Sequence, residues 1–61
     1  MQLRAIRARK RMTRTELADR AGVSPWTIRA IEVRGVVPRI ETLRALAKAL
    51  DIPFEKLLAT F

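Results

Sequence analysis

Residues 12–32, MTRTELADRAGVSPWTIRAIE, decide the fold of this chain. Glu16 follows Thr13 by three residues, the spacing of a capping box, so a helix is predicted to begin directly after the threonine. Met12 before the cap and Leu17 after it are placed to form a hydrophobic staple. Two independent signals therefore mark the same helix start.

The same stretch contains a second helix start. Gly22 is expected to end the helix that follows Thr13, because glycine takes the left-handed backbone conformation without strain. Ser24 then caps a helix whose first residue is Pro25, where a missing N–H has no helical partner to lose. The predicted helices cover residues 14–20 and 25–34. Two short helices joined by a glycine turn form a helix-turn-helix unit.

The rest of the chain also has helical spacing, and no segment shows the sustained alternation of a strand. Further helices are predicted over residues 2–10, 40–50 and 54–60. The chain is therefore expected to be one all-α domain, residues 1–61, folded as a compact five-helix bundle. The side chains expected to face its core are Leu3, Ile6, Leu17, Ala18, Ala21, Ile28, Ile31, Leu43, Leu46, Ala47 and Leu50.

Composition excludes several classes of function. The 61 residues include no cysteine and no histidine, which removes disulfides, thiolate zinc sites and the usual catalytic nucleophile–base pairs. We expect no enzymatic activity, no cofactor and no metal. Residues 1–10 lack the apolar run of a secretory signal, and no stretch approaches the ~20 apolar residues that span a bilayer. The sequence predicts a soluble, cytoplasmic protein.

The net charge of +7 is concentrated at one end of the chain. Residues 1–15 carry six basic side chains and no acid, whereas residues 16–61 carry seven bases and six acids. A basic face that is merely solvated is one interpretation. A binding surface for a polyanion is the other, and we favour it because neutralised phosphates release counterions.

Four segments, in this order and at this spacing, resemble the Cro/phage-repressor (XRE-type) helix-turn-helix family. They are LRAIR, MTRTELADRAGVS, TIRAIE and PRIETLRALAKALDIPFEKLL, and together they cover nearly the whole chain. The resemblance implies a lambda-repressor-like five-helix bundle whose third helix enters the DNA major groove. It also implies a transcriptional regulator, most often a repressor, that binds double-stranded DNA as a dimer and is nucleoid-associated when bound.

Four positions depart from the family pattern. Arg14 replaces a glutamine that holds a DNA phosphate and braces the third helix, and an arginine cannot accept a hydrogen bond. Arg11 replaces a glycine, at a cost in backbone strain. The glycine after the third helix comes one place late, at Gly35. Arg39 replaces a serine cap, so the fourth helix is expected to begin without a side-chain cap.

The third helix presents two different faces. At 100° per residue, Ile28, Ile31 and Glu32 share one side. The opposite side is expected to read bases, and the family's reading positions together with this geometry give Pro25, Trp26, Arg29, Ala30 and Val33. Arg29 suits guanine O6 and N7, and the apolar side chains suit thymine methyl groups. The alternatives are that Trp26 packs sideways against the second helix or a partner subunit, and that Arg29 is simply solvated.

The resemblance assigns further roles. Arg7 and Glu32 correspond to the family's internal ion pair, which joins the first helix to the third. Phosphate contacts are expected at the edges of the helix-turn-helix unit, where helix N-terminal N–H groups also face outward. The candidate phosphate-binding residues are Thr13, Arg14, Ser24, Arg39, Lys10 and Arg11.

The end of the chain is unusually apolar. We expect a homodimer interface at this end, placing two third helices about one DNA turn apart on a palindrome. Closure of the monomer core by the same residues is the alternative. The residues concerned are Phe54, Leu57, Leu58 and Phe61.

A second class of function fits the same sequence. An antitoxin would use this domain for DNA and its apolar C-terminal helix for a protein partner, the toxin. A membrane-active cationic peptide is disfavoured, because the basic residues are not confined to one stripe and the caps specify a globule.

Overall fold

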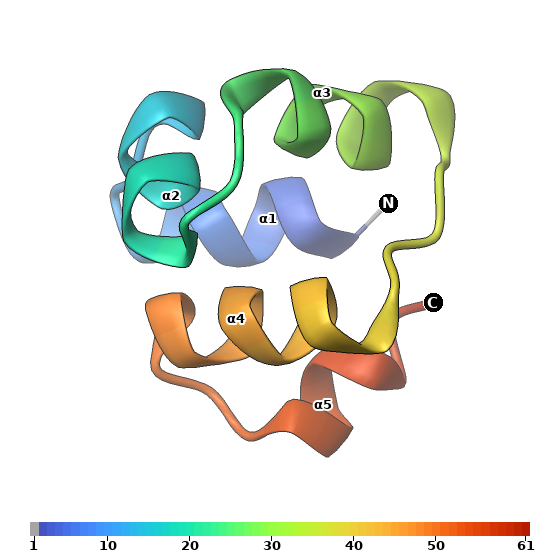
Figure 1. Cartoon of the computed structure of the whole chain (residues 1–61). Coiled ribbons are helices and arrows are strands. Elements are labelled where there is room, and N and C mark those ends of the chain that lie inside the picture. Colours follow the sequence, from blue (N-terminus) through green and yellow to red (C-terminus); the bar gives the residue numbers. More distant parts are fainter. Residues whose placement is uncertain (1) are drawn as a thin grey trace.

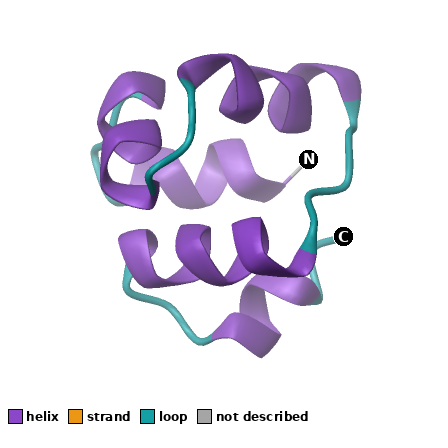
Figure 2. Ribbon diagram, in the orientation of Figure 1, coloured by secondary structure: helices purple, strands orange, loops and turns teal. Residues whose placement is uncertain are grey.

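The computed structural model describes residues 2–61, which form five helices and no strand (Figures 1 and 2). The helices are α1 (Gln2–Arg9), α2 (Arg14–Ala21), α3 (Pro25–Arg34), α4 (Ile40–Leu50) and α5 (Phe54–Leu58). Their envelope measures 23 × 22 × 20 Å. The prediction of an all-α, five-helix bundle is therefore confirmed. No helix within residues 2–61 is both long enough and apolar enough to cross a membrane.

The start of α2 has the predicted capping box. The Thr13 hydroxyl oxygen accepts a hydrogen bond from the Glu16 N–H at 3.0 Å, and the Glu16 carboxylate accepts one from the Thr13 N–H at 3.0 Å. At the start of α3, the Ser24 hydroxyl oxygen accepts from the Thr27 N–H at 3.2 Å, and Pro25 is the first helical residue. The capping side chains thus bind backbone N–H groups that would otherwise have no partner at the start of each helix.

Left-handed residues end four of the helices, α1 to α4. Gly22 has φ 71° after α2, and Arg11 and Asp51 both have φ 56° after α1 and α4. At Arg11 the next N–H, that of Met12, donates to the Arg7 carbonyl at 3.2 Å, which is the Schellman arrangement. Arg11 therefore stands in the left-handed conformation that the family's glycine would take without strain.

The connection between α3 and α4 has the two features predicted from the sequence, a glycine at residue 35 and no side-chain cap at Arg39. Gly35, with φ 69°, donates its N–H to the Ala30 carbonyl and so ends α3. Arg39 precedes α4 in an extended conformation and forms no side-chain capping bond. The expectation that α4 begins without a side-chain cap is confirmed.

The last helix is shorter than predicted. It ends at Leu58 instead of residue 60, because the N–H groups of Thr60 and Phe61 bond three residues back, to Leu57 and Leu58. The Thr60 hydroxyl also donates to the Leu57 carbonyl at 2.7 Å. Such bonds close the chain in a tight final turn that does not continue the α-helix.

One core holds the five helices together. In the packing, α2 contacts both α3 and α4, α1 contacts α3, and α5 covers the outer side of α4 (Figure 1). The buried residues of the core are Leu3, Leu17, Ala18, Ile28, Ile31, Leu43, Leu46, Ala47, Leu50 and Leu57, and Ile6 and Ala21 are partly buried against them. This set contains every residue predicted to face the core, together with Leu57.

The assignment of Leu57 to a dimer surface was wrong. Its side chain is fully buried, because a helix as short as α5 needs its one inward leucine to cover α4. Phe54 and Phe61 are half-buried against the same core. Leu58 remains on the surface, with 43% of its area exposed.

Candidate nucleic-acid interface

The outer face of α3 is open to solvent. Ile28 and Ile31 anchor the helix in the core, while Trp26 is 73% exposed and Val33 is 59% exposed. Ala30 is half-buried, and Pro25 is exposed. The orientation deduced from helical spacing is therefore correct, and packing against α2 does not bury Trp26.

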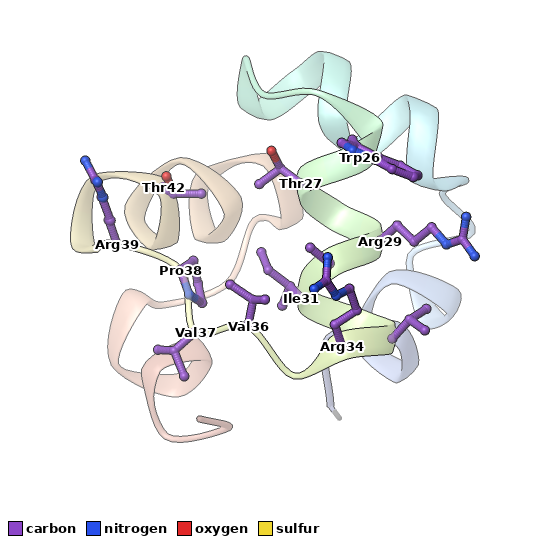
Figure 3. Close-up of a pocket in the computed structure, with 12 residues that line it drawn as sticks. Trp26, Thr27, Arg29, Ile31, Arg34, Val36, Val37, Pro38, Arg39 and Thr42 are labelled. Carbon is purple, nitrogen blue, oxygen red and sulfur yellow. The ribbon is translucent and has the colours of Figure 1, made fainter.

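Trp26 has a neighbour on its own helix. The Arg29 guanidinium carbon lies over the Trp26 ring, 5.6 Å from the ring centroid, within the range of a cation–π contact. In Figure 3 both side chains project from the same side of α3. One turn of the helix thus offers an aromatic surface and a cation side by side.

A hollow of about 570 Å³ lies beside these residues, between α3, the connection after it and the start of α4 (Figure 3). Arg29, Arg34 and Arg39 line it together with apolar groups that include Val36 and Val37. Among the described residues that line this hollow, none is acidic. The surface next to the outer face of α3 is therefore concave, partly apolar and positively charged.

Glu32 fixes α3 from the opposite side. Its carboxylate accepts a hydrogen bond from Arg7 Nε at 2.8 Å and from Arg7 Nη2 at 3.1 Å. A third bond comes from Arg14 Nε, also at 3.1 Å. The Glu32 side chain is only 1% exposed, whereas that of Arg14 is 37% exposed. The ion pair between α1 and α3 is present, and Arg14 adds a link from α2.

The two arginines decide the charge of this site. Burial raises the pKa of Glu32, but the hydrogen bonds from Arg7 and Arg14 outweigh burial and leave that pKa lowered. The hydrogen bond to Glu32 raises the pKa of Arg7. Glu32 is therefore a carboxylate at neutral pH and serves the structure of the domain.

The candidate phosphate residues do not form a single group. Thr13 and Ser24 lie at the first turns of α2 and α3, where their hydroxyl oxygens already cap N–H groups. Arg39 lines the hollow beside α3. Lys10 lines a different hollow, of about 300 Å³, with Lys56 and residues of the α4–α5 turn. Each hollow thus holds one member of the predicted set, and Thr13 and Ser24 line neither.

Several exposed residues of this region were missed from the sequence. Val36, Val37 and Ile40 are exposed, and Arg34 lines the hollow together with the two valines. A signal existed, since two valines directly before Pro38 stand outside any helical spacing and so have no place on an inward face. No three acidic side chains within residues 2–61 gather closely enough to hold a metal ion.

Comparison with known proteins agrees with this geometry. The helix-turn-helix family model matches residues 3–57. The chain belongs to this helix-turn-helix family. The resemblance to Cro and phage repressors is therefore confirmed. No solved structure gave a match.

Two curated relatives, both from Bacillus subtilis (strain 168), are similar over nearly the whole chain. The helix-turn-helix protein is 46% identical over 59 residues to the "HTH-type transcriptional repressor RghR", covering 93% of this chain and 43% of RghR. It is 40% identical over 60 residues to the "Uncharacterized HTH-type transcriptional regulator RghRB", covering 95% of this chain and 42% of that protein. The chain thus spans less than half the length of these curated relatives.

Proposed function

We propose that this helix-turn-helix chain binds a specific site in double-stranded DNA and represses transcription, with α3 in the major groove. The observation that carries the proposal is the exposed face of α3, where Trp26, Arg29 and Val33 project from a helix anchored by Ile28 and Ile31. An arginine fork reads guanine O6 and N7, and apolar side chains contact thymine methyl groups. The name of the relative RghR, a transcriptional repressor, supports the regulatory role.

Base reading would fall to the outer face of α3. Recognition helices read base edges mainly through their N-terminal residues, which here include Pro25 and Trp26. Few polar groups are available for this task, so sequence-dependent DNA shape would share in recognition. The proposed reading residues are Pro25, Trp26, Arg29, Ala30 and Val33.

Phosphate contacts would hold the protein in register. The N-terminal turns of α2 and α3 and the arginine-lined hollow are the surfaces that suit a phosphate. The proposed phosphate-binding residues are Thr13, Arg14, Ser24, Arg39, Arg11 and Lys10, of which Lys10 lies on the other hollow.

Selection of binding sites from a random duplex pool tests this function. Purified protein should enrich one short motif, and Arg29→Ala should enrich a motif that has lost a guanine. Arg44→Ala, which removes one charge from the exposed side of α4, is the matched control and should select the wild-type motif. Retention of DNA that is weak, salt-sensitive and blind to sequence would contradict the proposal.

We further propose that two copies pair through the end of α5. Leu58 is exposed there, next to the half-buried Phe54 and Phe61, whereas Leu57 takes no part. A two-fold pair would place the two α3 helices on half-sites about one DNA turn apart. Sedimentation should give a dimer for the wild type and a monomer for Leu58→Asp. A wild type that stays monomeric, with single half-sites in the selected motif, would contradict pairing.

The antitoxin alternative rests on the same exposed Leu58 and assigns its surface to a toxin. It predicts a stoichiometric complex with a small toxic protein encoded beside this chain. Co-expression of the two proteins decides it, because an antitoxin restores growth and its Leu58→Asp variant does not.

A further inference from the structure

We propose that Trp26 is a positioning residue for Arg29, so that the two side chains act as one unit that reads a guanine. The inference rests on the proposed function, in which α3 lies in the major groove. It goes further because it gives the tryptophan a role different from contact with a thymine methyl group.

The geometry of α3 brings the two side chains together. Residues three apart on a helix are neighbours, and here the Arg29 guanidinium carbon lies 5.6 Å from the centre of the Trp26 ring. Tryptophan is the aromatic residue that attracts cations most strongly. The ring is 73% exposed, so the core does not explain its presence at this place.

Arg29 has no competing acidic partner among the described residues. Within residues 2–61, the ion pairs are those of Arg7 and Arg14 with Glu32. A carboxylate would occupy the N–H fork of a guanidinium, which is the group that binds guanine O6 and N7. An aromatic face attracts the cation without supplying such an acceptor, and the fork stays available for a base.

Holding the arginine in advance also favours binding. A free arginine side chain samples many rotamers, and ordering it on DNA costs conformational entropy. A guanidinium that already lies over an indole ring loses less freedom when it meets the base. Figure 3 shows Arg29 reaching outward from α3, below the Trp26 ring. In the proposed function, this is the face of α3 that meets DNA.

Two substitutions of Trp26 separate positioning from direct contact. Trp26→Phe keeps an aromatic face, whereas Trp26→Leu keeps apolar bulk and removes that face. Each is measured alone and with Arg29→Ala, on the selected duplex and on the duplex with the guanine–cytosine pair changed to adenine–thymine. The readout is the Kd for the changed duplex divided by the Kd for the selected duplex.

Trp26→Leu should lower this ratio about two- to fivefold, the strength of an exposed cation–π contact, and Trp26→Phe should lower it less. With Arg29→Ala already present, Trp26→Leu should not change the ratio further. A ratio that Trp26→Leu leaves unchanged, or lowers equally with and without Arg29, would overturn the proposal. The proposal would also be overturned if replacing thymine by uracil weakened binding of the wild type and Trp26→Leu then had no further effect. Trp26 would in that case contact a thymine methyl group.

A measurement without DNA keeps this test independent of the proposed function. In the free protein, the ring current of Trp26 should shift the side-chain proton resonances of Arg29 upfield, and Trp26→Leu should abolish that shift. Absence of the shift in the wild type would overturn positioning even if a DNA site is found. A clear shift combined with sequence-blind DNA binding would overturn guanine reading along with the proposed function, leaving only the contact itself.

Discussion

The Nε atom of Arg7 lies 2.8 Å from a carboxylate oxygen of Glu32, which joins the first helix to the third. The same arginine donates from Nη1 to the Met12 carbonyl at 2.8 Å, in the turn before α2. One side chain therefore holds α1, the α1–α2 turn and α3 in fixed relation. Since Arg14 of α2 binds the same carboxylate, the position of the proposed reading helix depends on Glu32.

Replacing Glu32 by alanine is expected to unfold the domain. Removing one partner of a buried ion pair costs about 3–5 kcal/mol, because the remaining charge is left without compensation. A chain of this length has a free energy of unfolding of only about 3–9 kcal/mol. Circular dichroism without urea detects an unfolded variant, and urea denaturation measures the loss if the variant stays folded.

The control for this experiment is Glu41→Ala, which removes an exposed glutamate from the first turn of α4. Its cost should stay within about 1 kcal/mol, the size of an interaction with a helix dipole. Equal effects of the two substitutions would show that the Glu32 site does not support the fold.

Stability should fall in acid. Arg7 and Arg14 lower the pKa of Glu32 in the folded state below the value of about 4.3 that it has when unfolded. Between these two values the unfolded chain binds more protons, so the free energy of unfolding decreases as pH falls from about 4.3 through the folded pKa. Above that window the contribution is fully present. Urea midpoints measured from pH 7 to pH 3 record the change.

Glu16 must be separated from Glu32 in this titration. The hydrogen bond from the Thr13 backbone lowers the pKa of Glu16 as well, so both carboxylates act in the same direction. Glu16→Gln removes the share of the capping box, and the slope that remains belongs mainly to Glu32. Midpoints that stay constant from pH 5 to pH 3 in the wild type would refute the prediction.

Local signals in the sequence predicted most of the fold. The caps at Thr13 and Ser24 and the glycine at residue 22 each depend on neighbouring residues alone, so the bounds of α2 and α3 were predicted within one residue. The buried stripe of α4 was predicted for the same reason, because helical spacing identifies one face. Such features need no knowledge of the rest of the molecule.

Features that depend on contacts between residues far apart in the sequence were harder to predict. Leu57 and Leu58 are adjacent apolar residues, and only the packing of α5 on α4 decides which one is buried. The link from Arg14 to Glu32 joins residues 18 positions apart, so no local pattern reveals it. The contact between Arg29 and Trp26 was within reach, since a spacing of three residues on a helix brings two side chains together.

Arg14 is expected to serve DNA and α3 together. Its Nε binds Glu32, while the side chain is exposed enough for its terminal nitrogens to meet a phosphate. Arg14→Ala should therefore reduce the slope of log Kd against log salt by about one unit. Arg44→Ala, which removes a charge stacked over Phe54, should leave the slope unchanged. Identical slopes for the wild type and Arg14→Ala would contradict a phosphate contact.

Arg11→Gly is expected to stabilise the domain. Arg11 has φ 56°, a left-handed conformation that costs an ordinary residue roughly 1–2 kcal/mol and costs glycine little. Part of this gain is lost to the greater freedom of glycine in the unfolded chain, so the net effect should be about 1 kcal/mol, or about 4–8 °C in Tm. Arg11→Ala removes the same charge but keeps the strain, so it should leave Tm nearly unchanged. If both variants melt at the same temperature, the strain at Arg11 has no measurable effect on stability. If Arg11 also contacts a phosphate, both variants should lower the salt dependence of DNA binding equally, which separates its two roles.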